Sequence, residues 1–305
     1  MKNMSIERKR ILAGAVCIIL ALLLTGCGER LAEQQPESTT ESVSTALTES
    51  TKPTETIVED VRGEWSEFSE LYDYAAEISQ KYGITIFIGD TIPEWLGVEY
   101  CDDTELTRKC LEATDEALGC YPEEFFRRMC YDCFDRIYLY ITGTGGTAGA
   151  YSSGESFLWT NIDANCMEAG KGFYCYTLHH ELCHMIDYRM QSQYPGHMPS
   201  IDNKVWNSYN PEGFHYAGPE DEKQNEVYDT CFEYFAFSYG TCSELEDRAI
   251  FFGNAMAYYQ NVDMLPSWTE LPHCREKYEY FCLCLRHEFG WEGVEDVLPW
   301  EMALQ

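Results

Sequence analysis

Basic residues are scarce in this chain. Its 305 residues include 21 lysines and arginines against 52 aspartates and glutamates, which gives a formal net charge of −31 at neutral pH. A surface this acidic repels phosphate groups, so we predict no nucleic acid partner. The acidity would attract basic substrates, but it also gives a solvated exterior that resists aggregation, and we favour this second explanation.

The chain has no internal repeat, and its N-terminal apolar run is too short to span a bilayer comfortably. That run, Ile11 to Leu24, follows four basic residues, which is the pattern of an export signal. The sequence "LTGC" at 24–27 resembles the lipobox of bacterial lipoproteins, in which the chain is cut before an acylated cysteine. The resemblance predicts a lipoprotein signal peptide at 1–26 and a lipid on Cys27, which anchors the protein outside the cytoplasm on the bacterial cell membrane. A plain secretory signal or an uncleaved signal anchor is the alternative.

Aromatic residues are almost absent from residues 27–61. Ser, Thr, Glu, Gln and Pro dominate this segment, so it cannot bury enough apolar surface to fold. We predict a disordered tether there. Residues 62–305 are rich in Tyr, Phe and Trp, and their number suits one monomeric domain with or without a helical lobe.

The cysteine count is odd. Of fifteen cysteines, Cys17 leaves with the signal and Cys27 would carry the lipid, so at least one of the others is unpaired. Several could form disulfides outside the cell. A redox pair or a second zinc site is a weaker alternative for the lone C-x-x-C at 130–133 and for the cluster Cys282, Cys284 and His287.

Hydrophobic periodicity predicts an α+β fold. We expect helices at 64–82, 104–118, 122–131, 243–259 and 275–289, and strands at 84–89, 136–141 and 156–162. The glycine-rich residues 142–154 are predicted to be a flexible connection between two strands. Residues 190–222, interrupted by prolines, are predicted to be irregular and to form a wall or lid of a cleft.

The sequence "TLHHELCHMID" at 177–187 holds three of the seven histidines. On a helix, His180 and His184 project from the same face, one turn apart, and Glu181 stands beside them. In this H-E-x-x-H pattern two imidazoles bind zinc and the glutamate takes a proton from the attacking water, which suits peptide hydrolysis. His179 points about 100° away, so we expect it to be exposed or to support the ligands. Cys183 is expected to serve packing.

A catalytic zinc usually takes three protein ligands. The metzincin continuation is missing, because Asp187 and Met190 occupy its glycine and third-ligand positions. A glutamate nineteen residues after the second histidine is missing too, because Asn203 stands there. What remains is a carboxylate on a later helix: Glu226, Glu233 or Glu246.

Two stretches give the chain a recognisable pattern. "HELCHMIDY", followed at a distance by "FSYGTCSELEDRAIFF", resembles the catalytic region of the anthrax lethal factor family of gluzincins and of related bacterial zinc-binding metallopeptidase lipoproteins. "WNSYNPEGFHYAG" at 206–218 is similar to an insertion of the lipoprotein group. The resemblance covers about residues 136–255 and implies a zincin-like metalloprotease domain with a small mixed sheet, an active-site helix and a C-terminal helical lobe.

The resemblance also implies roles for single residues. Glu246 would be the third ligand, Tyr239 would donate a hydrogen bond to the oxyanion or a proton to the leaving amine, and Asp187 would orient a ligand imidazole. The alternatives are that Glu246 closes a capping box with Ser243 and that Tyr239 is a core aromatic. Family members often carry a second glutamate where this chain has Ile250, and that departure predicts looser metal binding or the use of another residue.

These observations predict an exported, membrane-anchored, Zn²⁺-dependent peptidase that acts on a peptide or protein substrate. One alternative is a surface lipoprotein that retains zinc and binds a peptide or another ligand without cutting it. A weaker alternative is a solute receptor or stalk that holds no metal.

Overall fold

The computed structural model describes residues 56–131, 134–153, 155–192, 197–218, 224–262 and 267–305. The predicted signal peptide, Cys27 and the tether up to residue 55 lie outside these described residues. Residues 56–61 run along the domain, where Ile57 N donates to Asp135 O at 2.8 Å and Glu59 N donates to Thr85 Oγ1 at 3.0 Å. Within the described residues, none of the helices has the length and apolar character to cross a membrane.

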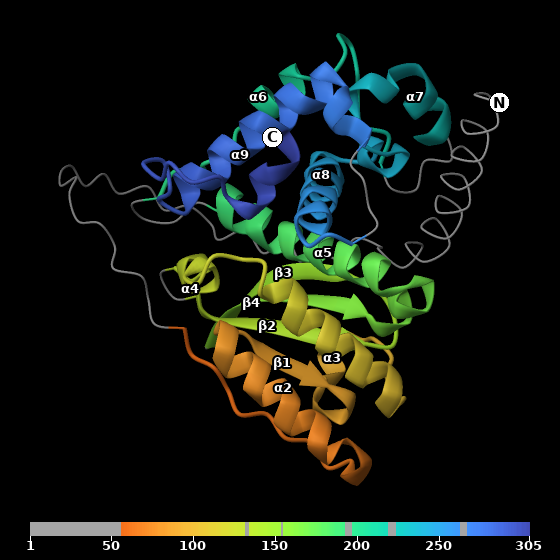
Figure 1. Cartoon of the computed structure of the whole chain (residues 1–305), viewed down its shortest axis with the longest axis vertical. Helices are drawn as coiled ribbons and strands as arrows, with labels where there is room; N and C mark the ends of the chain where they lie inside the picture. Colours follow the sequence, from red (N-terminus) through yellow and green to blue (C-terminus); the bar gives the residue numbers. More distant parts are fainter. Residues whose placement is uncertain (1–55, 132–133, 154, 193–196, 219–223, 263–266) are drawn as a thin grey trace.

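A four-stranded mixed sheet forms the lower half of the molecule in Figure 1. Its spatial order is β1-β2-β4-β3, with β1, β2 and β4 parallel and β3 antiparallel to β4 at the edge. The three predicted strands are confirmed. The bounds are β1 (Thr85–Ile88), β2 (Phe134–Thr142), β3 (Thr147–Ser153) and β4 (Glu155–Asp163).

The prediction of a flexible connection at 142–154 was wrong, because this segment contains β3. Its glycines, alanines and serines have low β-propensity, and the period-2 pattern of apolar residues is absent. The strand nevertheless pairs with β4 along its whole length, from Thr147 opposite Asn161 to Ser153 opposite Glu155. Backbone pairing with a long neighbour therefore overrides the local preference.

Helices cover one face of the sheet. The side chains of β2 alternate between the two faces of the sheet. Those of Ile137, Leu139 and Ile141 belong to the main core under the helices. Those of Tyr138 and Tyr140 belong to a smaller cluster on the opposite face. The predicted helices are confirmed within a few residues. The first four are α2 (Ser69–Tyr82), α3 (Thr104–Leu118), α4 (Phe125–Met129) and α5 (Lys171–Gln191).

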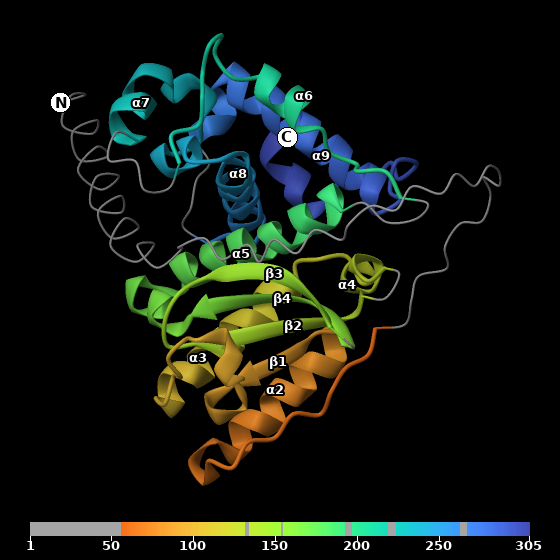
Figure 2. The ribbon, with the colours of Figure 1, turned by 180° about the vertical axis from the view of Figure 1, so that it is seen from behind.

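Helix α5 lies between the sheet and a C-terminal helical lobe, as Figures 1 and 2 show. It packs against β3 and β4 on one side and against α8 on the other. The lobe contains α6 (Asn203–Ser208), α7 (Gln224–Cys231), α8 (Glu244–Tyr259) and α9 (Pro272–Glu288). The fold is therefore α+β, with a small mixed sheet and a helical lobe, as predicted.

The segment 190–222 was predicted to be irregular and to form a wall or lid of a cleft, and its described part is irregular except for the end of α5 and for α6. It contains α6, and the Trp206 side chain is completely buried in the core. Trp206 Nε1 donates to the Tyr216 hydroxyl at 3.0 Å, and this hydroxyl donates to Asp247 Oδ2 at 2.9 Å. These aromatic residues thus stabilise the lobe, because their polar ends find partners inside it.

Two buried ion pairs connect the helices around α8. The Nε of Arg248 lies 2.7 Å from Asp187 Oδ2 on α5, and the Nζ of Lys277 on α9 lies 2.6 Å from Asp247 Oδ2. All four side chains are at most 1% exposed. The Lys277 ammonium also lies 4.1 Å from the centre of the Phe235 ring, so a cation–π contact adds to the pair.

The cysteines of the described residues are all unpaired thiols. The predicted disulfides are therefore not found among them, and Cys133 of the C-x-x-C lies outside the described residues. Cys183 is completely buried on α5, which confirms its packing role. Cys282 and Cys284 are buried too, while His287 bonds to Glu292 at 2.6 Å instead of joining them in a metal site.

Replacing Lys277 by Met should lower the free energy of unfolding by about 3–5 kcal/mol, because Asp247 would be left buried without a counter-charge. Combining this change with Asp247→Asn should recover most of the loss, because the uncompensated charge is removed. Urea unfolding followed by circular dichroism measures both effects. Lys109→Met, which breaks an exposed pair with Glu105, is the control and should leave the transition unchanged.

Candidate metal centre

The middle of α5 carries His180, Glu181 and His184. This helix is buried nearly all round, since the sheet covers one side and the lobe the other. The sheet and the lobe therefore fix the position of α5 from both sides. The two histidines face α8, and their rings are nearly perpendicular, with centroids 4.8 Å apart.

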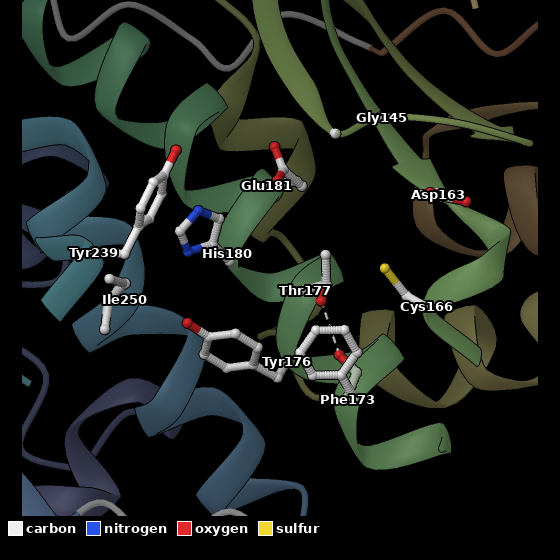
Figure 3. Close-up of a pocket in the computed structure, with 11 residues that line it drawn as sticks. Gly145, Asp163, Cys166, Phe173, Tyr176, Thr177, His180, Glu181, Tyr239 and Ile250 are labelled. Carbon is white, nitrogen blue, oxygen red and sulfur yellow. Dashed lines mark hydrogen bonds between the residues drawn. The ribbon is translucent and has the colours of Figure 1, made fainter. Parts of the chain in front are cut away.

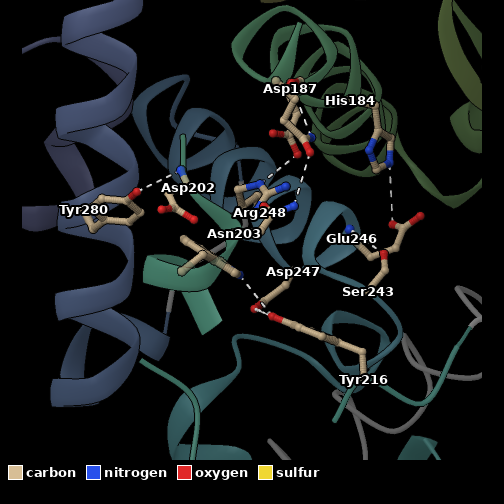
Figure 4. Close-up of polar contacts among 12 residues, drawn as sticks. His184, Asp187, Asp202, Asn203, Tyr216, Ser243, Glu246, Asp247, Arg248 and Tyr280 are labelled. Atoms are coloured by element: carbon tan, nitrogen blue, oxygen red, sulfur yellow. Dashed lines mark hydrogen bonds and ion pairs between the residues drawn. The ribbon is translucent and has the colours of Figure 1, made fainter. Parts of the chain in front are cut away.

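Three side-chain atoms converge between α5 and α8. His180 Nε2 lies 3.2 Å from His184 Nε2, and Glu246 Oε2 lies 3.1 Å from the first and 3.6 Å from the second. Ligands of a tetrahedral zinc, with bonds of roughly 2.0–2.1 Å, are separated by about 3.4 Å. The donor set and its spacing thus fit a zinc ion, and Figure 4 shows Glu246 extending from α8 toward His184.

Glu246 reaches the histidines instead of closing a capping box. Ser243 is the N-cap of α8 and accepts a hydrogen bond from Glu246 N at 3.2 Å, which is one half of the box. The carboxylate does not form the other half, because it points to the imidazoles. Of the other two candidates, Glu233 is exposed, and the side chain of Glu226 lies outside the described part of the chain.

The ligand atoms interact electrostatically. Burial lowers the pKa of His184, but the nearby carboxylate of Glu246 outweighs this and raises it to about 9. The pKa of Glu246 is raised by burial, and the two imidazoles outweigh that effect and hold it far below its usual range. A proton therefore occupies this cluster at neutral pH when no cation is bound.

Glu181 is the unusual member of the site. It is completely buried, and neither carboxylate oxygen forms a hydrogen bond with the described residues. Burial is the main reason why its pKa is raised. A carboxylate that lacks a protein partner in such surroundings is costly, so this group points to a small polar partner that a metal centre supplies.

Gly146 lies directly against Glu181. A Cβ atom at position 146 would lie 2.6 Å from Glu181 Oε1, which no real side chain allows. The loop before β3 therefore approaches the carboxylate this closely only because residue 146 is a glycine. No pattern in the sequence indicated this contact, because it depends on how the sheet edge lies over α5.

Tyr239 and Ile250 line the same pocket as His180 and Glu181, which Figure 3 shows. The pocket has a volume of about 490 Å³, including its open mouth. Tyr239 comes from the 3₁₀ turn Ser238–Thr241, just before α8. Ile250, one turn after Glu246, is only 2% exposed, so it provides an apolar wall of this pocket.

Asp187, one turn after His184, was predicted to orient a ligand imidazole, but among the described residues its carboxylate pairs with Arg248 and not with a histidine. The guanidinium Nε donates to Asp187 Oδ2 at 2.7 Å, and Nη1 donates to Asn203 Oδ1 at 3.0 Å. Figure 4 shows this group beside the ligands. The prediction did not include Arg248, although a charged residue inside the apolar run of α8 was a signal for a buried ion pair.

His179 is not exposed, so that part of the prediction was wrong. It is completely buried, Nδ1 pairs with the Tyr121 hydroxyl at 3.0 Å, and Nε2 pairs with Gln260 Oε1 at 3.3 Å. Burial lowers its pKa to about 4. His179 is therefore a neutral core residue that holds α5 against its neighbours.

His180, Glu181 and His184 also lie close enough together to form a possible metal-binding group. Its ligand atoms spread over as much as 4.8 Å, which is wider than the set with Glu246. Because Glu181 lies further out, it suits contact through a water molecule better than direct ligation. No family model, curated protein or solved structure matches this chain.

Glu246→Ala should lower the affinity for Zn²⁺ by more than about 100-fold, because it removes a direct ligand. Replacing a residue that only orients a ligand already lowers metal affinity by about 10–100-fold. Competition with a chromophoric chelator measures the affinity. Glu244→Ala is the matched control on the same helical turn, since the Glu244 carboxylate accepts from Asn207 Nδ2 and does not reach the histidines. Equal affinities of the two variants would contradict the ligand role of Glu246.

Zinc binding should release about one proton near pH 7.5, because His184 is protonated below its pKa of about 9 and must lose the proton to ligate. The affinity should rise with pH and level off above about 9. Calorimetry in two buffers with different ionisation enthalpies measures the released protons. Identical heats in both buffers would show that His184 is already neutral.

Proposed function

We propose that this chain is a zinc-dependent peptidase with a zincin-like domain, exported and anchored to the bacterial cell membrane through Cys27. The observation that carries the proposal is the convergence of His180, His184 and Glu246, with spacings of 3.1–3.6 Å, beside the buried and unpartnered carboxylate of Glu181. The resemblance to the lethal factor family of gluzincins, which rests on the same residues, is consistent with it.

The residues of the site then have defined roles. His180, His184 and Glu246 would hold the zinc, which supplies Lewis acidity that polarises a carbonyl group and lowers the pKa of water. Glu181 accepts the proton of the attacking water at a carboxylate oxygen and passes it to the leaving amine. Burial raises the pKa of Glu181, which suits this exchange because it makes the carboxylate a better proton acceptor.

Tyr239 and Ile250 shape the pocket in which the substrate would be bound. Tyr239 is proposed to donate a hydrogen bond from its hydroxyl to the oxygen on which negative charge develops. The apolar side chain of Ile250 excludes water from the ligand cluster, which strengthens the electrostatic interactions inside it. In this proposal the three ligands His180, His184 and Glu246 suffice without a second glutamate at position 250.

The mechanism is tested by Glu181→Gln in the purified domain. The variant should bind about one zinc per chain, because Gln keeps the shape of the side chain and the ligands are untouched. Cleavage of a peptide library should fall by about 10²–10⁴-fold, since the general base is lost. Mass spectrometry of the products and elemental analysis of the protein provide the two measurements.

Glu233→Gln is the control, because Glu233 is exposed and outside the site, and it should cut like the native protein. Undiminished cleavage by Glu181→Gln would remove the mechanism. A native protein that holds zinc but cuts no peptide would support the alternative, a lipoprotein that binds a peptide or another ligand without cutting it.

A further inference from the structure

A second phenol lies beside the candidate metal ligands. Tyr176 is one helical turn before His180 and two turns before His184, so all three side chains share one face of α5. The centroids of the Tyr176 and His180 rings are 6.0 Å apart. Figure 3 shows Tyr176 and Tyr239 next to the His180 ring, at the wall of the same pocket.

The hydroxyl of Tyr176 forms no hydrogen bond with the described residues, although the residue is only 5% exposed. Other buried phenols nearby are paired: the Tyr174 hydroxyl bonds to Thr114 at 3.0 Å, and that of Tyr278 donates to Trp300 O at 2.7 Å. Tyr176 lines the pocket, so its hydroxyl is placed to donate to an acceptor that enters there. Tyr176 is therefore a donor at the pocket wall, and its hydroxyl has no partner among the described residues.

The surroundings keep this hydroxyl protonated. Burial raises the pKa of Tyr176, and the carboxylates of Glu246 and Glu181 raise it further. The group is consequently a hydrogen-bond donor at every physiological pH. What it can bind is an acceptor, such as the carbonyl oxygen of an amide.

Two other polar residues of this pocket wall, Thr177 and Asp163, already have partners within the protein. Thr177 Oγ1 donates to Phe173 O at 2.9 Å, and Asp163 Oδ1 accepts from Asn165 N at 2.8 Å. The rings of Phe173 and Tyr176 make the wall apolar, with ring centroids 6.2 Å apart. An acceptor that enters here loses its water, and a hydrogen bond from the hydroxyl of Tyr176 would offset part of that loss.

We propose that Tyr176 is a substrate-binding residue, whose hydroxyl donates a hydrogen bond to a carbonyl oxygen of the peptide held in the pocket beside His180. The inference rests on the proposed peptidase function and deepens it, since it names a group that holds the substrate. It assigns the residue one turn before the H-E-x-x-H motif to recognition of the peptide backbone.

The test compares Tyr176→Phe with Tyr174→Phe, two changes that each remove one hydroxyl from the same helix. Tyr176→Phe should lower kcat/KM for peptide cleavage about tenfold, mainly through KM, because one neutral hydrogen bond to the bound substrate is lost. Its melting temperature and zinc content should stay the same, since no bond within the protein is broken. Tyr174→Phe should show the reverse, with a lower melting temperature and unchanged kcat/KM.

A second readout does not need catalysis. In the Glu181→Gln background, adding Tyr176→Phe should raise the Kd of an uncleaved peptide about tenfold, measured by fluorescence anisotropy. Unchanged KM and Kd in an active, zinc-loaded protein would overturn the role of Tyr176 and leave the peptidase proposal intact. A loss of zinc or of thermal stability in Tyr176→Phe would also overturn it, because the hydroxyl would then be structural. A native protein that neither cuts nor binds any peptide would overturn both proposals.

Discussion

The packing of α8 against α5 is the constraint on which the candidate site depends. The two imidazoles come from α5 and the carboxylate from α8, some sixty residues later in the chain. The Asp187–Arg248 pair joins the same two helices, one turn after His184 and two residues after Glu246. A metal centre needs its ligands within about 0.5 Å of their working positions, and a rigid buried contact provides that precision where a loop does not.

Several charged side chains are buried in and beside this contact, and most of them, but not all, are paired with an opposite charge. Asp187, Arg248, Asp247 and Lys277 are paired, so that Coulomb attraction and cation–π contacts offset part of their desolvation. Glu181 is equally buried, yet it has no partner among the described residues. Unpaired buried carboxylates are unfavourable for stability, so they are typically found where function requires them.

Local patterns predicted much of the fold. The helix at 104–118 has the predicted bounds, and the strands around β1, β2 and β4 followed from short β-branched and aromatic runs. Strand β3 was missed because its stability comes from pairing with β4, which leaves no trace in side-chain periodicity. Trp206 was expected near a cleft and lies in the core, because the partner of its Nε1, Tyr216, is placed by tertiary packing.

The sequence by itself determined that His180 and His184 share one face of a helix with Glu181 beside them, because a period of 3.6 residues is a local property. The sequence did not decide which of three glutamates, Glu226, Glu233 or Glu246, is the third ligand. Only the resemblance favoured Glu246. The tertiary structure decided that Glu246 meets the imidazoles and that the Tyr176 hydroxyl has no partner among the residues that the structure describes. Both results depend on contacts between segments far apart in the chain, which local spacing does not encode.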